Sequence, residues 1–235
     1  MLFELITLGV SVLALVVLGL AGPAYRLGMS LESAQSIVRW AAHGCVAAAI
    51  VAIVAGVLAY RARAWLRVTV AALAAVIGLT GFVIGFDAYR RETSLPSIHD
   101  ITTDLENPPT FTAVIARRAD APNRLDRTPQ LVELQRQGYS DLAPLTVATR
   151  PEQTFDRALA VAQARGWEIV TADKSSGRIE ATDTTRWFGF VDDISIRLTA
   201  WGSGTRVDVR SVSRTGIGDA GRNADRIRGF LKELQ

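Results

Sequence analysis

Cysteine is almost absent from this chain, in which Cys45 is the only one among 235 residues. A single thiol excludes an internal disulfide framework and any cysteine-rich zinc module. Histidine is nearly as scarce, with two residues. His99, Asp100 and Asp104 come nearest to a metal-ligand set, but their stretch shows no regular structure that would fix their geometry. We therefore predict no metal site and no cofactor.

A surplus of positive charge is missing from the C-terminal part of the chain. Residues 1–86 carry five arginines against two acids, whereas residues 87–235 carry 21 basic and 21 acidic side chains. A protein that binds the phosphate backbone needs an excess of cations on the domain that contacts the polymer. The sequence therefore excludes nucleic acid as a partner, although the whole chain has a formal charge of +3.

Three stretches have no charged residue at all: 5–25, 40–60 and 68–86. A helix needs about 20 apolar residues to cross the roughly 30 Å hydrocarbon core of a bilayer. Tyrosine and tryptophan lie at the ends of these stretches, as they do at membrane interfaces. We predict three transmembrane helices with about these bounds, in contact with membrane lipid. The alternatives are a cleaved signal peptide at 5–25, which lacks a basic leading region, and the core of a soluble bundle.

Small residues in the second and third stretches predict close packing of helices. Gly81 and Gly85 form a GxxxG pattern, and such spacing lets helix backbones approach one another within lipid. We expect a three-helix bundle within the chain, with a homodimer through Gly81 and Gly85 as the alternative.

Basic residues near the ends of the three stretches predict the orientation in the membrane. Arg61, Arg63 and Arg67 are concentrated in the short turn between the second and third helices. Short loops rich in arginine stay in the cytoplasm. We therefore expect a multi-pass protein of the inner (cell) membrane in which everything after Phe86 is periplasmic or extracytoplasmic.

The rest of the chain divides by pattern into two parts. Residues 87–125 form a linker with extended and turn motifs, and residues 126–235 form a folded domain. Strands are predicted where apolar residues alternate or cluster between turn residues. The predicted strands are 145–148, 167–172, 178–182, 194–201 and 206–214.

Two helices complete the predicted domain. Thr149–Glu152 reads as a capping box with proline in the first turn, which predicts a helix as far as Gly166. Residues 219–234 place alanine, isoleucine and leucine on one face of a second helix. The sum is an α+β domain, in which an antiparallel sheet carries helices on one face.

Several motifs, in order, resemble the DUF1499 family, a domain of unknown function. They are Ile98–Asp104 followed by Asn107–Pro109, then Gly177–Thr182, Trp187–Asp193, Arg206–Arg214 and the closing Gly218–Ile227. The resemblance covers roughly residues 95–235, and the three helices before it are not part of it. It implies a membrane or envelope context, and it supplies no activity.

A GxGxxG pattern lies between a predicted strand and the last helix. A dinucleotide-binding fold needs a second parallel strand with an acidic residue about 20 positions further on, and this chain predicts a single helix there. An anion held at the helix start is the alternative to a structural turn capped by Asp219. The residues of this candidate site for an anion or a partner are Arg210, Ser211, Ser213, Arg214, Gly216, Gly218 and Arg222.

Charged residues also lie within the predicted strands. Asp192 and Asp193 are adjacent, so they point to opposite faces and cannot share one proton or one metal. Asp208 shares a face with the arginines two positions before and after it, and Arg197 lies across from them. We expect a solvated ladder of ion pairs here.

A hydrolase would need a base that works near neutral pH, and His99 is the only imidazole outside the predicted helices. His99 and Asp100 with Ser211 or Ser213 would make a base, an orienting group and a nucleophile. Neither the spacing nor a nucleophile elbow supports this set. We therefore assign no catalytic residue and favour binding over catalysis, with an envelope hydrolase that uses His99 and Asp100 as the alternative.

Trp187, Phe188 and Phe190 form the most aromatic stretch of the domain. They belong to the core or, if exposed, make an aromatic contact with lipid or a partner protein. We interpret the chain as an integral membrane protein that displays a DUF1499-like domain at the membrane surface. Its expected role is a binding or scaffolding module of the cell envelope, with an envelope protein as partner. A structural subunit of a membrane complex is the remaining alternative.

Overall fold

The computed structural model describes residues 1–235. The chain forms two compact units. The helical unit is Met1–Arg91 with Arg186–Gly189, and the sheet unit is Glu92–Thr185 with Phe190–Gln235. The first boundary, after Arg91, falls inside the stretch 87–125 that the sequence predicts as a linker.

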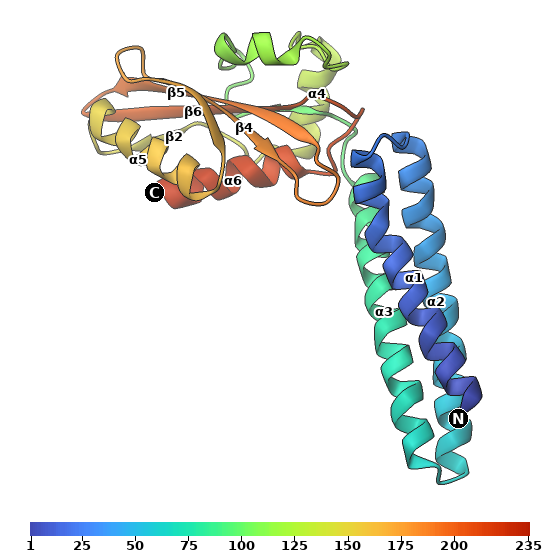
Figure 1. Ribbon diagram of the computed structural model, residues 1–235. Helices are drawn as coiled ribbons and strands as arrows, with labels where there is room; N and C mark the ends of the chain where they lie inside the picture. The colour runs from blue at the N-terminus through green and yellow to red at the C-terminus, as the bar shows by residue number, and fades with distance from the viewer. The chain divides into compact units, whose positions relative to one another are not determined.

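The helical unit consists of α1 (Leu2–Arg26), α2 (Leu31–Arg61) and α3 (Trp65–Ser94), coloured blue to green in Figure 1. Each helix is long and apolar enough to cross a membrane, by length and composition. The three uncharged stretches of the sequence lie within them. Three such helices are consistent with a membrane-anchored protein. α2 begins well before Trp40, because the Ser30 hydroxyl accepts a hydrogen bond of 3.2 Å from a backbone N–H of the first turn.

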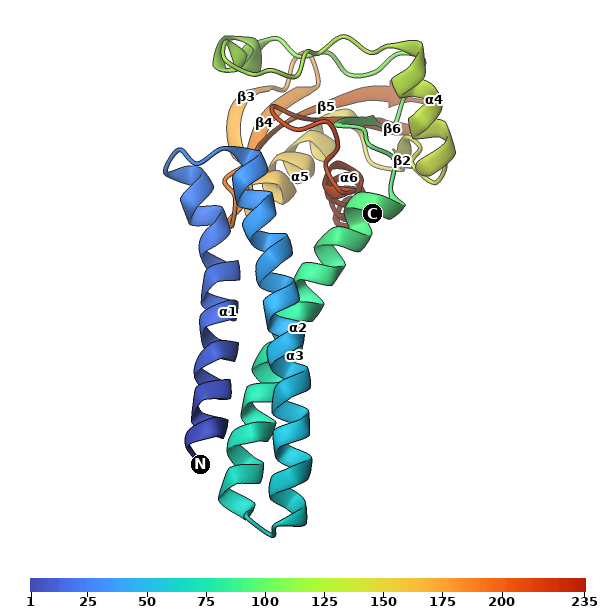
Figure 2. The ribbon, with the colours of Figure 1, turned by 90° about the vertical axis from the view of Figure 1, so that its right-hand side faces the viewer.

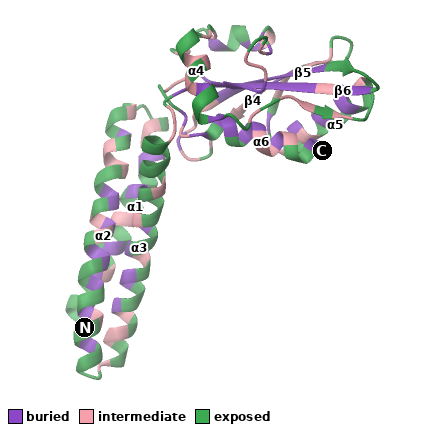
Figure 3. Cartoon of the chain, turned by 180° about the vertical axis from the view of Figure 1, so that it is seen from behind, coloured by how far each residue is buried: buried purple, intermediate pink, exposed green.

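Small side chains fill the interior of the helical unit. The buried positions of α2 and α3 are alanine, glycine and Cys45, whereas many valines and leucines are exposed on the outside (Figure 3). A Cβ added to Gly78 would lie 2.7 Å from the carbonyl oxygen of Cys45, and Gly81 and Gly85 pack as closely against Cys45 and Ala42. The expected packing within the chain is therefore confirmed, and the homodimer through Gly81 and Gly85 stays a prediction.

The sheet unit contains six antiparallel strands in the order β1-β6-β5-β4-β3, with β2 pairing with the same edge of β6 as β1. Their bounds are β1 Asp100–Thr102, β2 Leu145–Val147, β3 Glu168–Asp173, β4 Arg178–Thr184, β5 Val191–Trp201 and β6 Gly204–Ser213. The helices are α4 Pro129–Gly138, α5 Pro151–Ala164 and α6 Arg222–Leu234, with the short 3-10 helix η1 at Ala113–Arg118. This is the α+β domain that the sequence predicts (Figure 1).

One face of the sheet carries the apolar core. Ile194 and Ile196 alternate along β5, are fully buried and belong to one cluster with Phe155 of α5 and Phe230 of α6. The ring of Trp167 stacks on Phe230, with 5.4 Å between the centroids. Figure 2 shows α5 and α6 on the same side of the sheet. The alternation in this stretch therefore predicted the buried face correctly.

The opposite face of the sheet is covered by residues 103–128, called the covering segment below (Figure 2). β1 and η1 both lie within 87–125, and β1 pairs with β6. A strand of three residues gives no alternating pattern, and the apolar contacts of the covering segment come from the isolated residues Phe111, Val114 and Leu125. Hydrophobic periodicity therefore carried no signal for these elements.

The predicted capping box is wrong, and the helix predicted at 219–234 begins at Arg222. α5 begins at Pro151, but its N-cap is Arg150, which makes no side-chain cap hydrogen bond. Thr149 does not cap the helix, because it joins the sheet instead: its carbonyl accepts a hydrogen bond of 2.7 Å from the hydroxyl of Thr205. α4 was not predicted, although it follows Thr128, whose hydroxyl caps its first turn.

Candidate functional site

The polar face of the sheet arises from strand alternation. Arg206, Asp208 and Arg210 of β6 point away from the apolar core, because the valines between them, Val207 and Val209, point into it. The covering segment brings further charged side chains over this face. Ion pairs join the segment to the sheet, beside a small apolar cluster of Phe111 and Val114 with Val212 of β6.

Asp100 of β1 holds two arginines on this face. Nη2 of Arg210 lies 2.7 Å from Oδ2 of Asp100 and Nε lies 3.1 Å from Oδ1, which is a fork-like, bidentate pair. Nη1 of Arg127 lies 2.7 Å from the same carboxylate, and all three side chains are buried. Arg127 also donates to Gln135 of α4, which in turn bonds the backbone of Thr102.

A second buried carboxylate, Asp193 of β5, also holds two arginines. Nη1 of Arg118 in η1 lies 2.5 Å from Asp193, and Nη2 of Arg214 lies 2.8 Å from it. The hydrogen bond to Asp193 raises the pKa of Arg214. Glu180 of β4 accepts the backbone N–H of Thr112 at 2.7 Å, which fixes the start of η1. Asp100 and Asp193 thus each hold two arginines, so the arginines outnumber the aspartates in these two clusters.

Asp104 and Asp208 lie between two further arginines. Nη2 of Arg197 is 3.0 Å from both carboxylates, and Nη2 of Arg206 is 2.8 Å from Asp104 and 3.1 Å from Asp208. The predicted ladder around Asp208 is therefore present. The expectation that it is solvated is wrong, because the side chain of Asp208 is only 1% exposed and Asp104 of the covering segment lies against the same arginines.

The residues of the predicted anion or partner site are not gathered in one place. Arg210 and Arg214 lie on the polar face and are paired with aspartates. Ser211 and Ser213 lie on the other face, beneath α6. The hydroxyl of Ser211 donates to Oδ1 of Asn223 at 2.6 Å, and Nδ2 of Asn223 donates to the hydroxyl of Ser213 at 2.9 Å. Sequence reasoning missed Asn223, since a lone asparagine in a helix carries no distinctive signal.

The glycine pattern forms a turn whose amides are already occupied. Gly216 has a φ of 92°, in the left-handed region, and Gly218 follows in the same loop. Asp219 accepts two backbone N–H groups at the start of α6, at 2.9 and 2.6 Å. Burial raises the pKa of Asp219. The carboxylate thus fills the position an anion would take, and Arg222 is exposed beside it.

His99 does not meet a serine. Its Nδ1 lies 3.3 Å from the backbone oxygen of Ile217, and Asp100 next to it is paired with arginines on the polar face. Ser211 and Ser213 are both bonded to the amide of Asn223. The base, orienting group and nucleophile that the hydrolase alternative requires are therefore not brought together.

The aromatic stretch is divided between the two units. Trp187 and Phe188 belong to Arg186–Gly189, which groups with the helical unit, whereas Phe190 groups with the sheet unit. Phe188 is buried, and its ring meets the edge of the Trp187 ring at 4.9 Å between centroids. An aromatic contact with lipid or a partner through this stretch stays a prediction.

An open pocket of about 540 Å³ lies on the polar face beside the edge strand β3. Arg178 of β4 lines it, together with Thr112 and Ala113 of the covering segment, Thr171 and Asp173 of β3, and Ser176 of the turn. The cross-strand neighbours of Arg178 are Asp173 in β3 and Arg197 in β5. The guanidinium of Arg178 makes no salt bridge and no hydrogen bond, unlike those of the arginines that hold the covering segment.

Asp173 is the one acid in this pocket, and its oxygens are already satisfied. The N–H and the hydroxyl of Ser175 and of Ser176 all donate to its carboxylate, and these hydrogen bonds lower the pKa of Asp173 to about 2. The guanidinium of Arg178 therefore remains available to an acidic group from outside the chain. The sequence could not single out Arg178, because which arginine lacks a carboxylate depends on how the covering segment lies.

No group of three or more histidine, cysteine or acidic side chains is placed to hold a metal ion. The chemistry that Arg178 and its pocket offer is recognition of an acidic group by a guanidinium. A family model described as a protein of unknown function, DUF1499, matches residues 100–234. The chain belongs to the DUF1499 family. The match begins at the first residue of β1 and ends at the last residue of α6, so the DUF1499 domain includes the covering segment. No curated protein matches the chain.

Proposed function

We propose that the chain is a membrane-anchored binding module of the cell envelope, with its DUF1499 domain on the extracytoplasmic side of the inner membrane. The anchor confines the domain to the membrane surface and raises its effective concentration near partners there. Arg61, Arg63 and Arg67 at the turn between α2 and α3 support a cytoplasmic position for that turn. The domain follows α3 and therefore emerges on the other side.

The observation that carries the binding role is the unpaired guanidinium of Arg178. The six arginines that hold the covering segment in place are each already bonded to at least one aspartate. Arg178 lies in an open pocket with the hydroxyl of Thr171, which also has no partner in the chain. A guanidinium in this setting binds a carboxylate or a phosphate through a fork of two hydrogen bonds. The proposed partner therefore presents an acidic group to this pocket.

Calorimetric titration of the full chain in detergent with citrate and with inorganic phosphate tests the pocket. We expect saturable binding that is weakened at least about tenfold by Arg178→Gln, since a hydrogen bond to a charged group contributes about 1.5–3 kcal/mol. Arg222→Gln, which removes an exposed arginine elsewhere on the domain, is the matched control and should bind as the wild type does. Equal affinity in both variants would remove the basis for this proposal.

The orientation is tested separately. A reporter that is active only outside the cytoplasm, fused after Gln235, should be active, and one that is active only inside should be silent. The opposite pattern would place the domain in the cytoplasm and contradict the envelope role, whatever the result at Arg178.

A further inference from the structure

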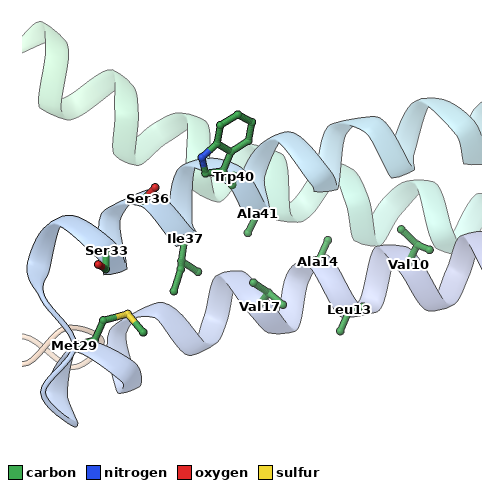
Figure 4. Close-up of a pocket in the computed structure, with 10 residues that line it drawn as sticks. All are labelled: Val10, Leu13, Ala14, Val17, Met29, Ser33, Ser36, Ile37, Trp40 and Ala41. Atoms are coloured by element: carbon green, nitrogen blue, oxygen red, sulfur yellow. The ribbon is translucent and has the colours of Figure 1, made fainter.

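A groove of about 600 Å³ opens between α1 and α2 within the helical unit (Figure 4). It is lined by Val10, Leu13, Ala14 and Val17 of α1, by Ser33, Ser36, Ile37, Trp40 and Ala41 of α2, and by Met29 of the connection between them. Its size falls in the range of about 300–1,000 Å³ that is usual for small-molecule sites. Figure 4 shows Val17 and Ile37 extending from opposite helices into it.

The groove changes in character along its length. The part of the groove farther from the α1–α2 connection is lined by Val10, Leu13, Ala14 and Val17. These residues belong to the uncharged stretch that fits the hydrocarbon core. Val10 and Val17 are seven residues apart, so they span about 10 Å along the helix axis. Ser33 and Ser36 line the other end, on the part of α2 that precedes its uncharged stretch.

A free positive charge lies at that polar end. Arg39 is three residues after Ser36, so the two lie on neighbouring positions of the same helix face. Arg39 is exposed and makes no salt bridge, and the Ser36 hydroxyl makes no hydrogen bond. Trp40 is 71% exposed, and tryptophan is enriched at the level of lipid headgroups. The apolar trough thus ends beside an unpaired cation and a hydroxyl at headgroup depth.

We infer that this groove is a binding site for one anionic phospholipid. An acyl chain would lie along Val10, Ala14 and Val17, and the headgroup phosphate would meet Arg39 and the Ser36 hydroxyl. The charge of Arg39 selects an anionic over a zwitterionic headgroup, and the immersion of the helices in a bilayer makes lipid the molecule that reaches the groove. This site is independent of Arg178 and of the domain's proposed partner.

Trp40 lines the groove and reports its occupancy. The full chain in detergent is titrated with phosphatidylglycerol whose acyl chains carry bromine, a quencher of tryptophan fluorescence, and with brominated phosphatidylcholine. We expect saturable quenching by phosphatidylglycerol at lower lipid concentration than by phosphatidylcholine. The saturable component should disappear in Trp40→Phe and persist in Trp65→Phe, which removes an exposed tryptophan of α3.

Two pairs of variants separate the acyl chain from the headgroup. Val17→Phe places bulk in the groove and should abolish saturable quenching, whereas Val16→Phe alters a neighbouring exposed position outside the groove and should not. Arg39→Gln should weaken binding of phosphatidylglycerol about fivefold, in line with one basic residue at a membrane surface. Arg61→Gln, at the other end of α2, should leave it unchanged.

Each result decides the inference. If Val17→Phe and Val16→Phe quench alike while both remain monodisperse with wild-type helix content, the groove holds no lipid. The assignment of an anionic headgroup is wrong if the two lipids quench at the same lipid concentration. It is also wrong if Arg39→Gln and Arg61→Gln bind phosphatidylglycerol with the same affinity.

Discussion

Asp192 and Asp193 are neighbours in β5, and their carboxylates lie on opposite faces of the sheet. Oδ2 of Asp192 lies 2.5 Å from Nη2 of Arg226 in α6, whereas Asp193 pairs with Arg118 and Arg214 on the polar face. The prediction that the two cannot share a proton or a metal is thereby confirmed, because the side chains of a strand alternate. Asp192 therefore pairs with the helix layer on one face of the sheet, and Asp193 pairs with the covering segment on the other.

Replacement of Asp193 by asparagine should strongly destabilise the domain. The change leaves two arginines facing a neutral group in a buried site, and breaking a buried ion pair costs about 3–5 kcal/mol. Chemical denaturation of the full chain in detergent, followed by the fluorescence of the domain, would measure the loss. Asp156→Asn is the matched control, because its pair with Lys174 is exposed and should contribute less than about 1 kcal/mol. Equal losses in the two variants would show that the pairs at Asp193 are solvated.

Tyr139 carries a buried hydroxyl with no hydrogen-bond partner. Because an unsatisfied buried polar group costs about 1–3 kcal/mol, Tyr139→Phe should raise the free energy of unfolding by about 1 kcal/mol at pH 7. Tyr60→Phe, at an exposed position, should leave it unchanged. A clear loss of stability in Tyr139→Phe would mean that the hydroxyl bonds an internal water.

Tyr139 also predicts a dependence of stability on alkaline pH. Burial, and next the nearby Asp219, raise the pKa of Tyr139 to about 12, above the value of about 10 for an exposed tyrosine. The folded state therefore keeps the proton more tightly than the unfolded state. The free energy of unfolding therefore does not depend on this proton below pH 10, and it falls as pH rises from 10 through 12. Denaturation at a series of pH values should show this component in the wild type and not in Tyr139→Phe.

Gly78 should keep the single thiol of the chain inaccessible. Cys45 is fully buried, and a side chain on Gly78 would collide with its backbone oxygen. In intact membranes, N-ethylmaleimide should leave wild-type Cys45 almost unmodified and should label most of Gly78→Leu, because α2 and α3 can no longer pack. Gly9→Leu, where an added side chain meets nothing, should remain protected. Rapid labelling of the wild type would contradict the packing of α3 against α2.

The elements that the sequence predicted are those in which apolar side chains set the pattern. Uncharged stretches marked the three long helices, and the alternation through Ile194 and Ile196 marked a strand with one buried face. β1 and η1 were missed because they are short and much of what holds them is ionic and distant in sequence. Asp100 pairs with Arg210, 110 positions further along the chain, and Arg118 pairs with Asp193, 75 positions further along. Periodicity cannot reveal such pairs, since they form only when the covering segment lies on the sheet.

The candidate site was predicted less well for the same reason. The sequence showed that arginines and aspartates alternate in β6, but it could not say which of these side chains pair with one another. The aspartates of β1 and of the covering segment reach Arg210, Arg197 and Arg206, whereas Arg178 is unpaired. Adding up charges along the chain therefore gave the neutrality of the domain but not which arginines remain unpaired.

The double pairing of β6, with β1 and β2 sharing its outer edge, has a consequence for proteolysis. A protease that cut after residue 125 and released the preceding chain would remove β1, and with it Asp100 and Asp104. Arg127 and Arg210 would lose their shared counter-ion, and half of the outer edge of β6 would offer unpaired N–H and C=O groups to another chain. The shed fragment would then be prone to strand-to-strand aggregation, whereas a cut before Ile98 would release a domain with that edge still closed.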